Sequence, residues 1–146
     1  MTDGPTTALM QKAYARWAPI YDVVYDKLTE PAARAAVAAS VACGPRVLEA
    51  GVGTGLSLGY YPANAEVVGV DLSEDMLRRA HEKVRKQGLT HVKSLQVMDV
   101  TRLGFPDESF DAVTAQFIIT LVPDLDAALS EFARVLRPGG EIVLAN

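Results

Sequence analysis

The stretch that decides the fold is Val47-Leu48-Glu49-Ala50-Gly51-Val52-Gly53-Thr54-Gly55. It begins as a short apolar strand containing one acid, and it continues into a turn with a glycine at every second position. Glycine allows the backbone to adopt positive φ values and to approach a ligand closely. Because ligands of open α/β sheets bind where the strands end, the stretch predicts a nucleotide-like cofactor beside this turn.

The spacing of the glycines indicates which kind of cofactor fits. A dinucleotide fingerprint is G-x-G-x-x-G, whereas here the pattern is G-x-G-x-G and Glu49 stands two residues before Gly51. Glu49 would repel a pyrophosphate and attract a cofactor that has an ammonium group and a sulfonium centre. Asp71 and Asp99 follow the next two predicted strands, where they can meet ribose hydroxyls and an adenine amino group. Three acids at successive strand ends favour a cationic nucleoside.

The rest of the chain alternates strands and helices, which predicts βαβ units and an α/β fold with a doubly wound, Rossmann-like parallel sheet. Ser73 and Asp124 are expected to begin helices as N-caps, and Gly44 and Gly88 to end them. The expected strands are residues 46–50, 66–70, 92–97, 110–115 and 141–145. The expected helices are residues 29–42, a short helix through Leu58, residues 74–87 and residues 124–136.

The segment before residue 29 has helical periodicity. Its large apolar residues recur in steps of four and three, which defines one helix face: Met10, Tyr14, Trp17, Tyr21, Val24 and Leu28. Pro19 predicts a kink or two short helices, and Thr29-Glu30-Pro31 predicts the start of a new helix. We therefore divide the chain into an amphipathic segment, residues 1–28, and a cofactor domain, residues 29–146. The segment can serve as a lid over a pocket or as a surface that contacts lipid.

Composition narrows the functional classes. The 146 residues suffice for one domain, and the net charge of −4 argues against nucleic acid as a partner of the whole chain. Cys43 is the one cysteine, which suits a reducing cytoplasm. His81 and His91 are expected at the surface, and no group of residues has the spacing of metal ligands.

Three motifs identify a family. Residues 47–55, Val70-Asp71-Leu72-Ser73-Glu74-Asp75-Met76-Leu77 and Leu136-Arg137-Pro138-Gly139-Gly140 resemble the class I S-adenosylmethionine-dependent methyltransferases. The resemblance covers residues 40–146. It implies strand order 3-2-1-4-5 and S-adenosylmethionine, or its product S-adenosylhomocysteine, as cofactor. Family members continue through two more strands and a helix, so we expect a sheet truncated before the usual last two strands.

A closer resemblance concerns the acceptor. Tyr14-Ala15-Arg16-Trp17-Ala18-Pro19-Ile20-Tyr21-Asp22, residues 55–62 and residues 116–123 are similar to the bacterial phosphatidylethanolamine N-methyltransferases. This implies methyl transfer to the amine of a phospholipid headgroup, in phosphatidylcholine synthesis. Two alternatives remain open: a methyltransferase of the same fold acting on another small molecule, such as a quinone precursor, and a non-catalytic cofactor-binding fragment.

The family pattern also implies the site residues. Glu49 and the backbone of Gly51 and Gly53 would hold the methionine part, and Asp71 the ribose. Gln116 would lie near the reacting methyl group, with Tyr21 and Tyr14 closing the pocket. The adenine would be surrounded by Leu72, Met76, Asp99 and the backbone of Met98 and Val100.

A phospholipid acceptor requires contact with a membrane. The aromatic N-terminal segment could supply it, as could residues 78–93, which hold six basic residues against Glu82; basic residues favour anionic lipid surfaces. A solvated helix face is the simpler interpretation of this basic run. We expect a cytoplasmic protein that associates peripherally with the inner membrane face. The fifth strand would be an exposed apolar edge, which invites pairing with a second copy.

Overall fold

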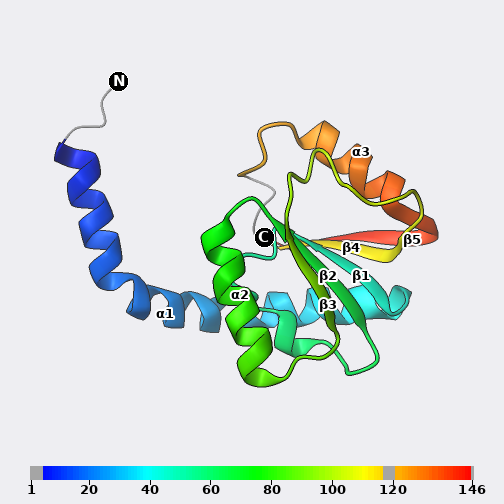
Figure 1. Cartoon of the computed structure of the whole chain (residues 1–146), viewed down its shortest axis with the longest axis horizontal. Coiled ribbons are helices and arrows are strands. Elements are labelled where there is room, and N and C mark those ends of the chain that lie inside the picture. Colours follow the sequence, from blue (N-terminus) through cyan, green and yellow to red (C-terminus); the bar gives the residue numbers. More distant parts are fainter. Residues whose placement is uncertain (1–4, 117–120, 146) are drawn as a thin grey trace. The chain divides into compact units, whose positions relative to one another are not determined.

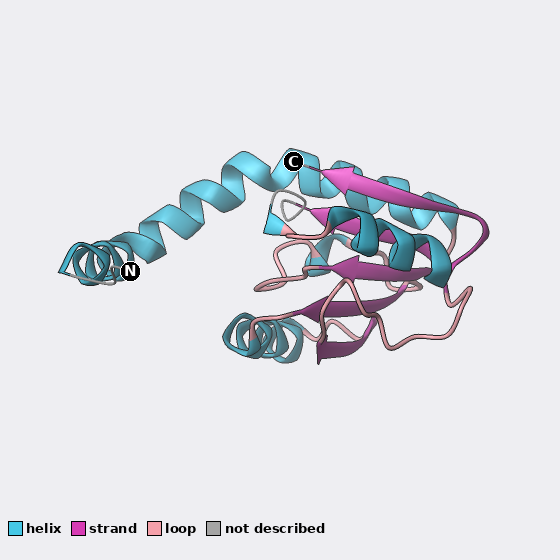
Figure 2. Cartoon of the chain, turned by 90° about the horizontal axis from the view of Figure 1, so that it is seen from above, coloured by secondary structure: helices cyan, strands magenta, loops and turns pink. Residues whose placement is uncertain are grey.

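The computed structural model describes residues 5–116 and 121–145, with side chains from residue 23 onward. The chain divides into two compact units, Met1–Pro31 and Ala32–Asn146, which are described separately. The second unit contains a five-stranded sheet between helices (Figures 1 and 2). Its strands are β1 (Arg46–Ala50), β2 (Glu66–Asp71), β3 (Val92–Val97), β4 (Phe110–Gln116) and β5 (Leu136–Ala145).

All strand pairs are parallel and the strand order is β3-β2-β1-β4-β5, which confirms the predicted Rossmann-like topology. In the centre of the sheet, Ala50 pairs with Val70 on one side and Ala115 on the other. The strands therefore end together on one side of the sheet, called here the carboxyl edge, and begin together on the opposite side, the amino edge. Neither term refers to the outer strands β3 and β5.

Each face of the sheet has its own core. On one face, helix α3 (Leu125–Val135) packs Phe132 against Leu48 and Val113. On the other face, helix α2 (Glu74–Gln87) and the end of helix α1 (Pro5–Cys43) cover Val47 and Val67. Alternate residues of β1 therefore point to opposite cores, as a strand with two covered faces requires.

The predicted helix caps of α2 and α3 are confirmed. The Ser73 hydroxyl accepts from the Met76 N–H at 3.2 Å, and the Asp124 carboxylate from the Ala127 N–H at 3.0 Å. Gly88 ends α2 in the left-handed conformation, with φ of 63°. These caps satisfy backbone donors and acceptors that a helix leaves free at its ends.

Helix α1 differs from the prediction. It runs through Pro19 and Pro31 as one helix, so the predicted start at Thr29 is wrong. The Thr29 hydroxyl donates to the Tyr25 carbonyl one turn earlier, at 2.7 Å, instead of capping a new helix. A threonine hydroxyl can make this bond inside a helix, and the alanine-rich sequence that follows favours continuation.

Two other segments also differ. Between β1 and β2, a stretch that the structure describes in full, there is no α-helix; a single turn of 3-10 helix, η1 (Leu58–Tyr60), takes the place of the predicted short helix. The predicted turn at residues 137–140 is part of β5, where the register with β4 shifts between Phe110 and Ala112. Within residues 5–116 and 121–145, no helix combines the length and apolar character needed to cross a bilayer.

Candidate functional site

The glycine turn, residues 51–55, lies at the carboxyl edge directly after β1. Gly51, Gly53 and Gly55 have φ values of 76°, 57° and 82°, a region that side chains disfavour. The Gly51 N–H donates to the Val70 carbonyl at 2.8 Å. The turn is therefore held against the end of β2, the neighbouring strand.

Asp71, the last residue of β2, connects two loops. One carboxylate oxygen accepts from the Gly53 N–H and the other from the Ser73 N–H, both at 2.8 Å. The side chain is half-buried. Because each carboxylate oxygen has two lone pairs, Asp71 can hold the glycine turn and still accept from ribose hydroxyls, the role predicted for it.

Exposed apolar side chains surround this carboxylate. Leu72 is 69% exposed, Met76 47% and Val97 57%. Val97 pairs with Asp71 across β2 and β3, and a Cβ atom at Gly53 would lie 3.8 Å from the Met76 sulfur. Apolar side chains left in water beside a polar anchor fit a ligand that has a flat, apolar ring system.

The predicted adenine-binding residues after β3 have distinct positions. The Asp99 carboxylate is exposed and accepts from the N–H and hydroxyl of Thr101, at 2.9 and 2.8 Å. The backbone bond, and then the hydroxyl bond, lower the pKa of Asp99. The Val100 side chain lies in the α3 core, so only its backbone can face a ligand. The Met98 N–H donates to the Asp71 carbonyl at 3.0 Å.

Glu49 is placed differently from the other two acids. It is 3% exposed, and its two carboxylate oxygens accept from the Ser57 hydroxyl at 2.6 Å and the Tyr61 hydroxyl at 2.9 Å. Burial raises the pKa of Glu49, although both hydroxyls oppose that shift. The glycine pattern did not point to Ser57 or Tyr61. The available signal was an acid inside an apolar strand, which requires buried donors nearby.

Gln116 ends β4, the strand next to the central β1, and is 8% exposed; its amide nitrogen donates to the Thr114 hydroxyl at 3.4 Å. Its predicted position near the reacting methyl group remains a prediction. Tyr14 and Tyr21 belong to helix α1, but their side chains lie outside the described residues.

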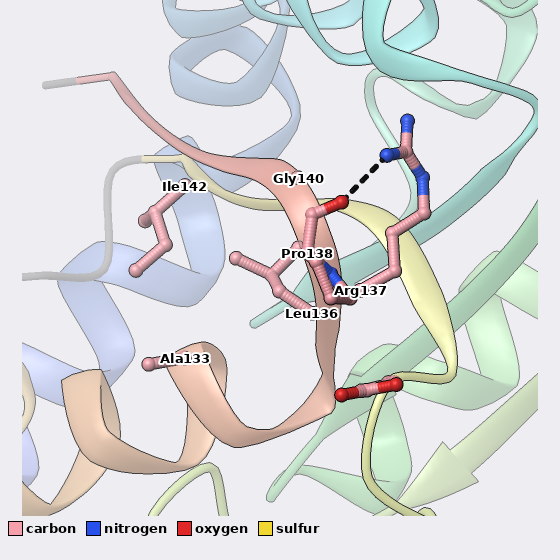
Figure 3. Close-up of a pocket in the computed structure, with 7 residues that line it drawn as sticks. Ala133, Leu136, Arg137, Pro138, Gly140 and Ile142 are labelled. Atoms are coloured by element: carbon pink, nitrogen blue, oxygen red, sulfur yellow. Dashed lines mark hydrogen bonds between the residues drawn. The ribbon is translucent and has the colours of Figure 1, made fainter.

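A cavity of about 470 Å³ lies away from this edge. Figure 3 shows it between Ala133 of α3 and the residues of β5 from Leu136 to Ile142. Leu136 pairs with Phe110, the first residue of β4, and none of the residues that line the cavity belongs to the glycine turn. Its one guanidinium, that of Arg137, donates to the Pro138 carbonyl at 2.9 Å. The cavity is therefore separate from the glycine turn.

Comparison with known proteins identifies the family. Residues 48–144 match the model of the methyltransferase domain family. The chain belongs to the S-adenosylmethionine-dependent methyltransferases. This methyltransferase is 49% identical over 137 residues to a phosphatidylethanolamine N-methyltransferase of Cereibacter sphaeroides, covering 94% of the chain and 67% of that protein. It is 44% identical over 79 residues to a demethylmenaquinone methyltransferase of Bacteroides fragilis, covering 54% and 32%.

A solved structure gives the same answer for the fold and cofactor. A phosphoethanolamine-type N-methyltransferase of Haemonchus contortus, in complex with phosphomonomethylethanolamine and S-adenosylhomocysteine, is 33% identical with a TM-score of 0.61. The match covers 69% of this chain and 24% of that one. S-adenosylmethionine is thus the cofactor of the methyltransferase.

The residues at the carboxyl edge fit this cofactor. Asp71 and Asp99 are acids with neutral donors as partners, beside exposed Leu72 and Met76. This combination suits a nucleoside with a positive charge. The N–H groups of Gly51 and Gly53 are already bonded within the chain. An ammonium group only donates hydrogen bonds, so the backbone groups of these glycines that could accept from it are their carbonyl oxygens.

The two histidines differ from each other. His81 is exposed, as predicted, but the prediction for His91 is wrong, since it is 6% exposed. The His91 Nε2 atom lies 2.6 Å from the Leu58 carbonyl oxygen, and its ring lies 6.1 Å from that of Tyr61. The Leu58 carbonyl of η1 needs a hydrogen-bond donor, which explains why His91 is buried beside it. Among the described residues, no three His, Cys, Asp or Glu side chains are grouped to hold a metal ion.

Proposed function

We propose that this methyltransferase transfers methyl groups to the amine of phosphatidylethanolamine-type headgroups. One observation supports this acceptor above others. The similarity to the phosphatidylethanolamine enzyme spans 137 residues, whereas the methyltransferase domain occupies residues 48–144. The similarity therefore extends into the segment before residue 48, outside the part that all such enzymes need for the cofactor.

The reaction requires little of the protein beyond alignment. When bound, S-adenosylmethionine supplies a methyl group already activated by its sulfonium. The chain then has to orient this group toward a deprotonated amine and exclude water. Asp71 and the glycine turn orient the nucleoside, and Gln116, at the end of β4, would line the approach of the amine. Tyr14 and Tyr21 would close the pocket and desolvate the nitrogen.

A lipid acceptor requires contact with a membrane, and two features, one in each compact unit, support such contact. In α1, Val23, Val24 and Leu28 are at least half exposed, although apolar. On α2 and after it, Arg78, Arg79, Arg85, Lys86 and Lys93 are exposed. Basic residues close to an anionic membrane contribute about 1 kcal/mol each. We infer peripheral association with the cytoplasmic face of an anionic membrane.

The test is methylation of vesicles. Radiolabelled S-adenosylmethionine is supplied with vesicles of phosphatidylethanolamine and phosphatidylglycerol, and with a demethylmenaquinone as competing acceptor. We expect label in the phospholipid and none in the quinone. Gln116→Ala should lower turnover with little change in S-adenosylhomocysteine affinity. The acceptor proposal fails if wild-type protein binds the cofactor and labels only the quinone.

Membrane association is measured separately by co-sedimentation with the same vesicles. Deleting residues 1–28 should abolish co-sedimentation at physiological salt, and reversing charge at Arg79 and Arg85 should weaken it. The matched control reverses no charge: Arg79→Lys with Arg85→Lys. Unchanged sedimentation of the deletion variant would contradict a role of the N-terminal segment.

A quinone precursor is the second candidate acceptor, because the demethylmenaquinone enzyme is 44% identical over 79 residues. That similarity covers 54% of the chain, so it favours the shared cofactor domain more than a shared acceptor.

We also propose pairing of two chains through β5, which is an outer strand of the sheet. A monodisperse monomer in size-exclusion chromatography would contradict this pairing.

A further inference from the structure

Glu49 lies beneath the chain that follows the glycine turn. As an odd-numbered residue of β1 it shares a face with Val47, whose core is covered by α1 and α2. The Glu49 residue is 3% exposed, and the hydrogen bonds of its carboxylate come from two hydroxyls, those of Ser57 and Tyr61. These two residues flank η1 (Leu58–Tyr60). The acid is thus bonded to both ends of one short helical turn.

The same turn has two further anchors. The Leu58 side chain is completely buried, and a Cβ atom at Gly55 would lie 2.8 Å from its Cδ1 atom. The Leu58 carbonyl oxygen lies 2.6 Å from the His91 Nε2 atom. Gly55 and residues 57–61 are therefore joined by packing and hydrogen bonds, and Glu49 is the buried acid bonded to this unit.

This segment needs such anchors because it has no regular helix of its own. A full α-helix after β1 would hold the glycine turn through its ladder of backbone hydrogen bonds. Here η1 has three residues, so side-chain hydrogen bonds must hold the glycine turn instead. A carboxylate that accepts two hydroxyl bonds provides stronger anchors than neutral acceptors would.

The geometry also makes Glu49 a poor ligand for the cofactor. A ligand at the carboxyl edge approaches from solvent, while the Glu49 oxygens face Ser57 and Tyr61 inside the core. The Glu49 oxygens retain lone pairs, but the residue is 3% exposed, so an ammonium group could reach them only by displacing the residues packed around them.

We propose that Glu49 is a positioning residue, which fixes residues 51–61 through Ser57 and Tyr61, and does not contact the ammonium group of the cofactor. The proposal rests on the cofactor and on no particular acceptor. It differs from the role that the glycine pattern suggested for Glu49, namely binding the methionine part.

Calorimetry with two ligands tests it. S-adenosylhomocysteine has the ammonium group, whereas 5′-methylthioadenosine keeps the nucleoside and sulfur but lacks the whole amino-acid part. We expect Glu49→Gln, Ser57→Ala and Tyr61→Phe each to weaken both ligands by the same factor, about tenfold for the loss of one charge-assisted hydrogen bond. In a double-mutant cycle, Glu49→Gln should add little to Tyr61→Phe.

Ser40→Ala is the matched control. Ser40 is also completely buried, but its hydroxyl donates to the Ala36 carbonyl of its own helix, at 2.7 Å. This variant should lower the melting temperature and leave both affinities unchanged. It separates a general loss of stability from a displaced glycine turn, and Tyr61→Phe and Ser57→Ala keep the test valid should Glu49→Gln not fold.

Two results would overturn the proposal. If Glu49→Gln weakens S-adenosylhomocysteine but not 5′-methylthioadenosine, Glu49 contacts the amino-acid part directly. If Ser57→Ala and Tyr61→Phe behave like Ser40→Ala, the contacts serve stability alone. Neither ligand has a sulfonium-activated methyl group, so both affinities are measured without turnover, and failure to methylate phospholipid would leave this result intact.

Discussion

The carboxylates at the amino edge and the carboxyl edge of the sheet have different kinds of hydrogen-bond partner. At the amino edge, Asp111 is 5% exposed and is bonded to the guanidinium groups of Arg46 and Arg137. At the carboxyl edge, Glu49 and Asp71 accept from hydroxyls and backbone N–H groups. Within the described part of the chain, neither takes part in an ion pair.

Because of this difference, we expect the amino edge to contribute to stability and the carboxyl edge to bind the ligand. The Asp111 carboxylate joins β4 to the Arg46 N–H of β1, at 2.9 Å, and a Cβ atom at Gly44 would lie 2.5 Å from its Cγ atom. Arg137, which it holds, also donates to the Cys43 carbonyl at 2.5 Å. Charge at this edge is neutralised internally. At the carboxyl edge, Asp71 is half-buried and is oriented by neutral backbone donors, so its negative charge remains available to a cationic ligand.

The largest expected effect would break the amino edge. Asp111→Ala removes the acceptor of the Arg46 N–H and the carboxylate partner of the Arg137 guanidinium. We expect the free energy of unfolding to fall by about 3 kcal/mol while S-adenosylhomocysteine binds as in wild type. Urea denaturation and calorimetry measure the two quantities. A large loss of affinity in the folded variant would show that the edges are not independent.

The second effect would break the carboxyl edge. Asp71→Ala removes the acceptor of the Gly53 N–H and the partner predicted for ribose. We expect the dissociation constant for S-adenosylhomocysteine to rise roughly 30-fold, equivalent to about 2 kcal/mol. Asp75→Ala is the control, because the Asp75 side chain is 86% exposed and pairs with Arg78. Equal affinities of the two variants would refute the assignment of Asp71.

A smaller effect would sharpen the comparison. Leu72 is 69% exposed, so truncating it should cost little stability. If the adenosine covers it, Leu72→Ala should weaken S-adenosylhomocysteine by about fivefold, as expected from about 1 kcal/mol of lost apolar burial. Leu144→Ala, at an exposed leucine of β5, should change neither affinity nor stability. Identical affinities for both variants would place the adenosine elsewhere.

The smallest expected effect is a pH dependence with opposite signs at the two edges. Burial raises the pKa of Asp111, but the Arg46 N–H and the Arg137 guanidinium outweigh it and hold the pKa below its ordinary value of 3.8. The stabilisation by Asp111 is therefore complete above pH 3.8 and is lost as the pH falls through the folded pKa. For Glu49, burial raises the pKa above 4.5, so stability is lost as the pH rises from 4.5.

Denaturation curves between pH 3 and 7 measure how the unfolding free energy depends on pH in wild type and in each variant. The difference in unfolding free energy between wild type and Asp111→Asn should shrink below pH 3.8. The difference between wild type and Glu49→Gln should grow as the pH falls toward 4.5. Parallel pH profiles of wild type and both variants would contradict this contrast between the edges.

The sequence predicted most of the fold because the relevant signals are local. The apolar runs predicted the strands, and Ser73, Asp124 and Gly88 predicted where helices begin and end. The errors at Thr29 and after Gly55 have one cause. Whether a hydroxyl caps a new helix or bonds within an old one, and whether a glycine turn leads into a helix, depends on neighbours that a single segment does not contain.

What the sequence by itself determined is the family and the cofactor, because glycine spacing and acids at strand ends are short-range patterns, and the strand order was implied by the resemblance to that family. Only the tertiary structure decided the partner of each acid. Asp111 meets Arg137, 26 residues away, and His91 meets Leu58, 33 residues away. Periodicity shows that Glu49 faces inward with Val47, but which donors meet it there depends on how distant segments pack.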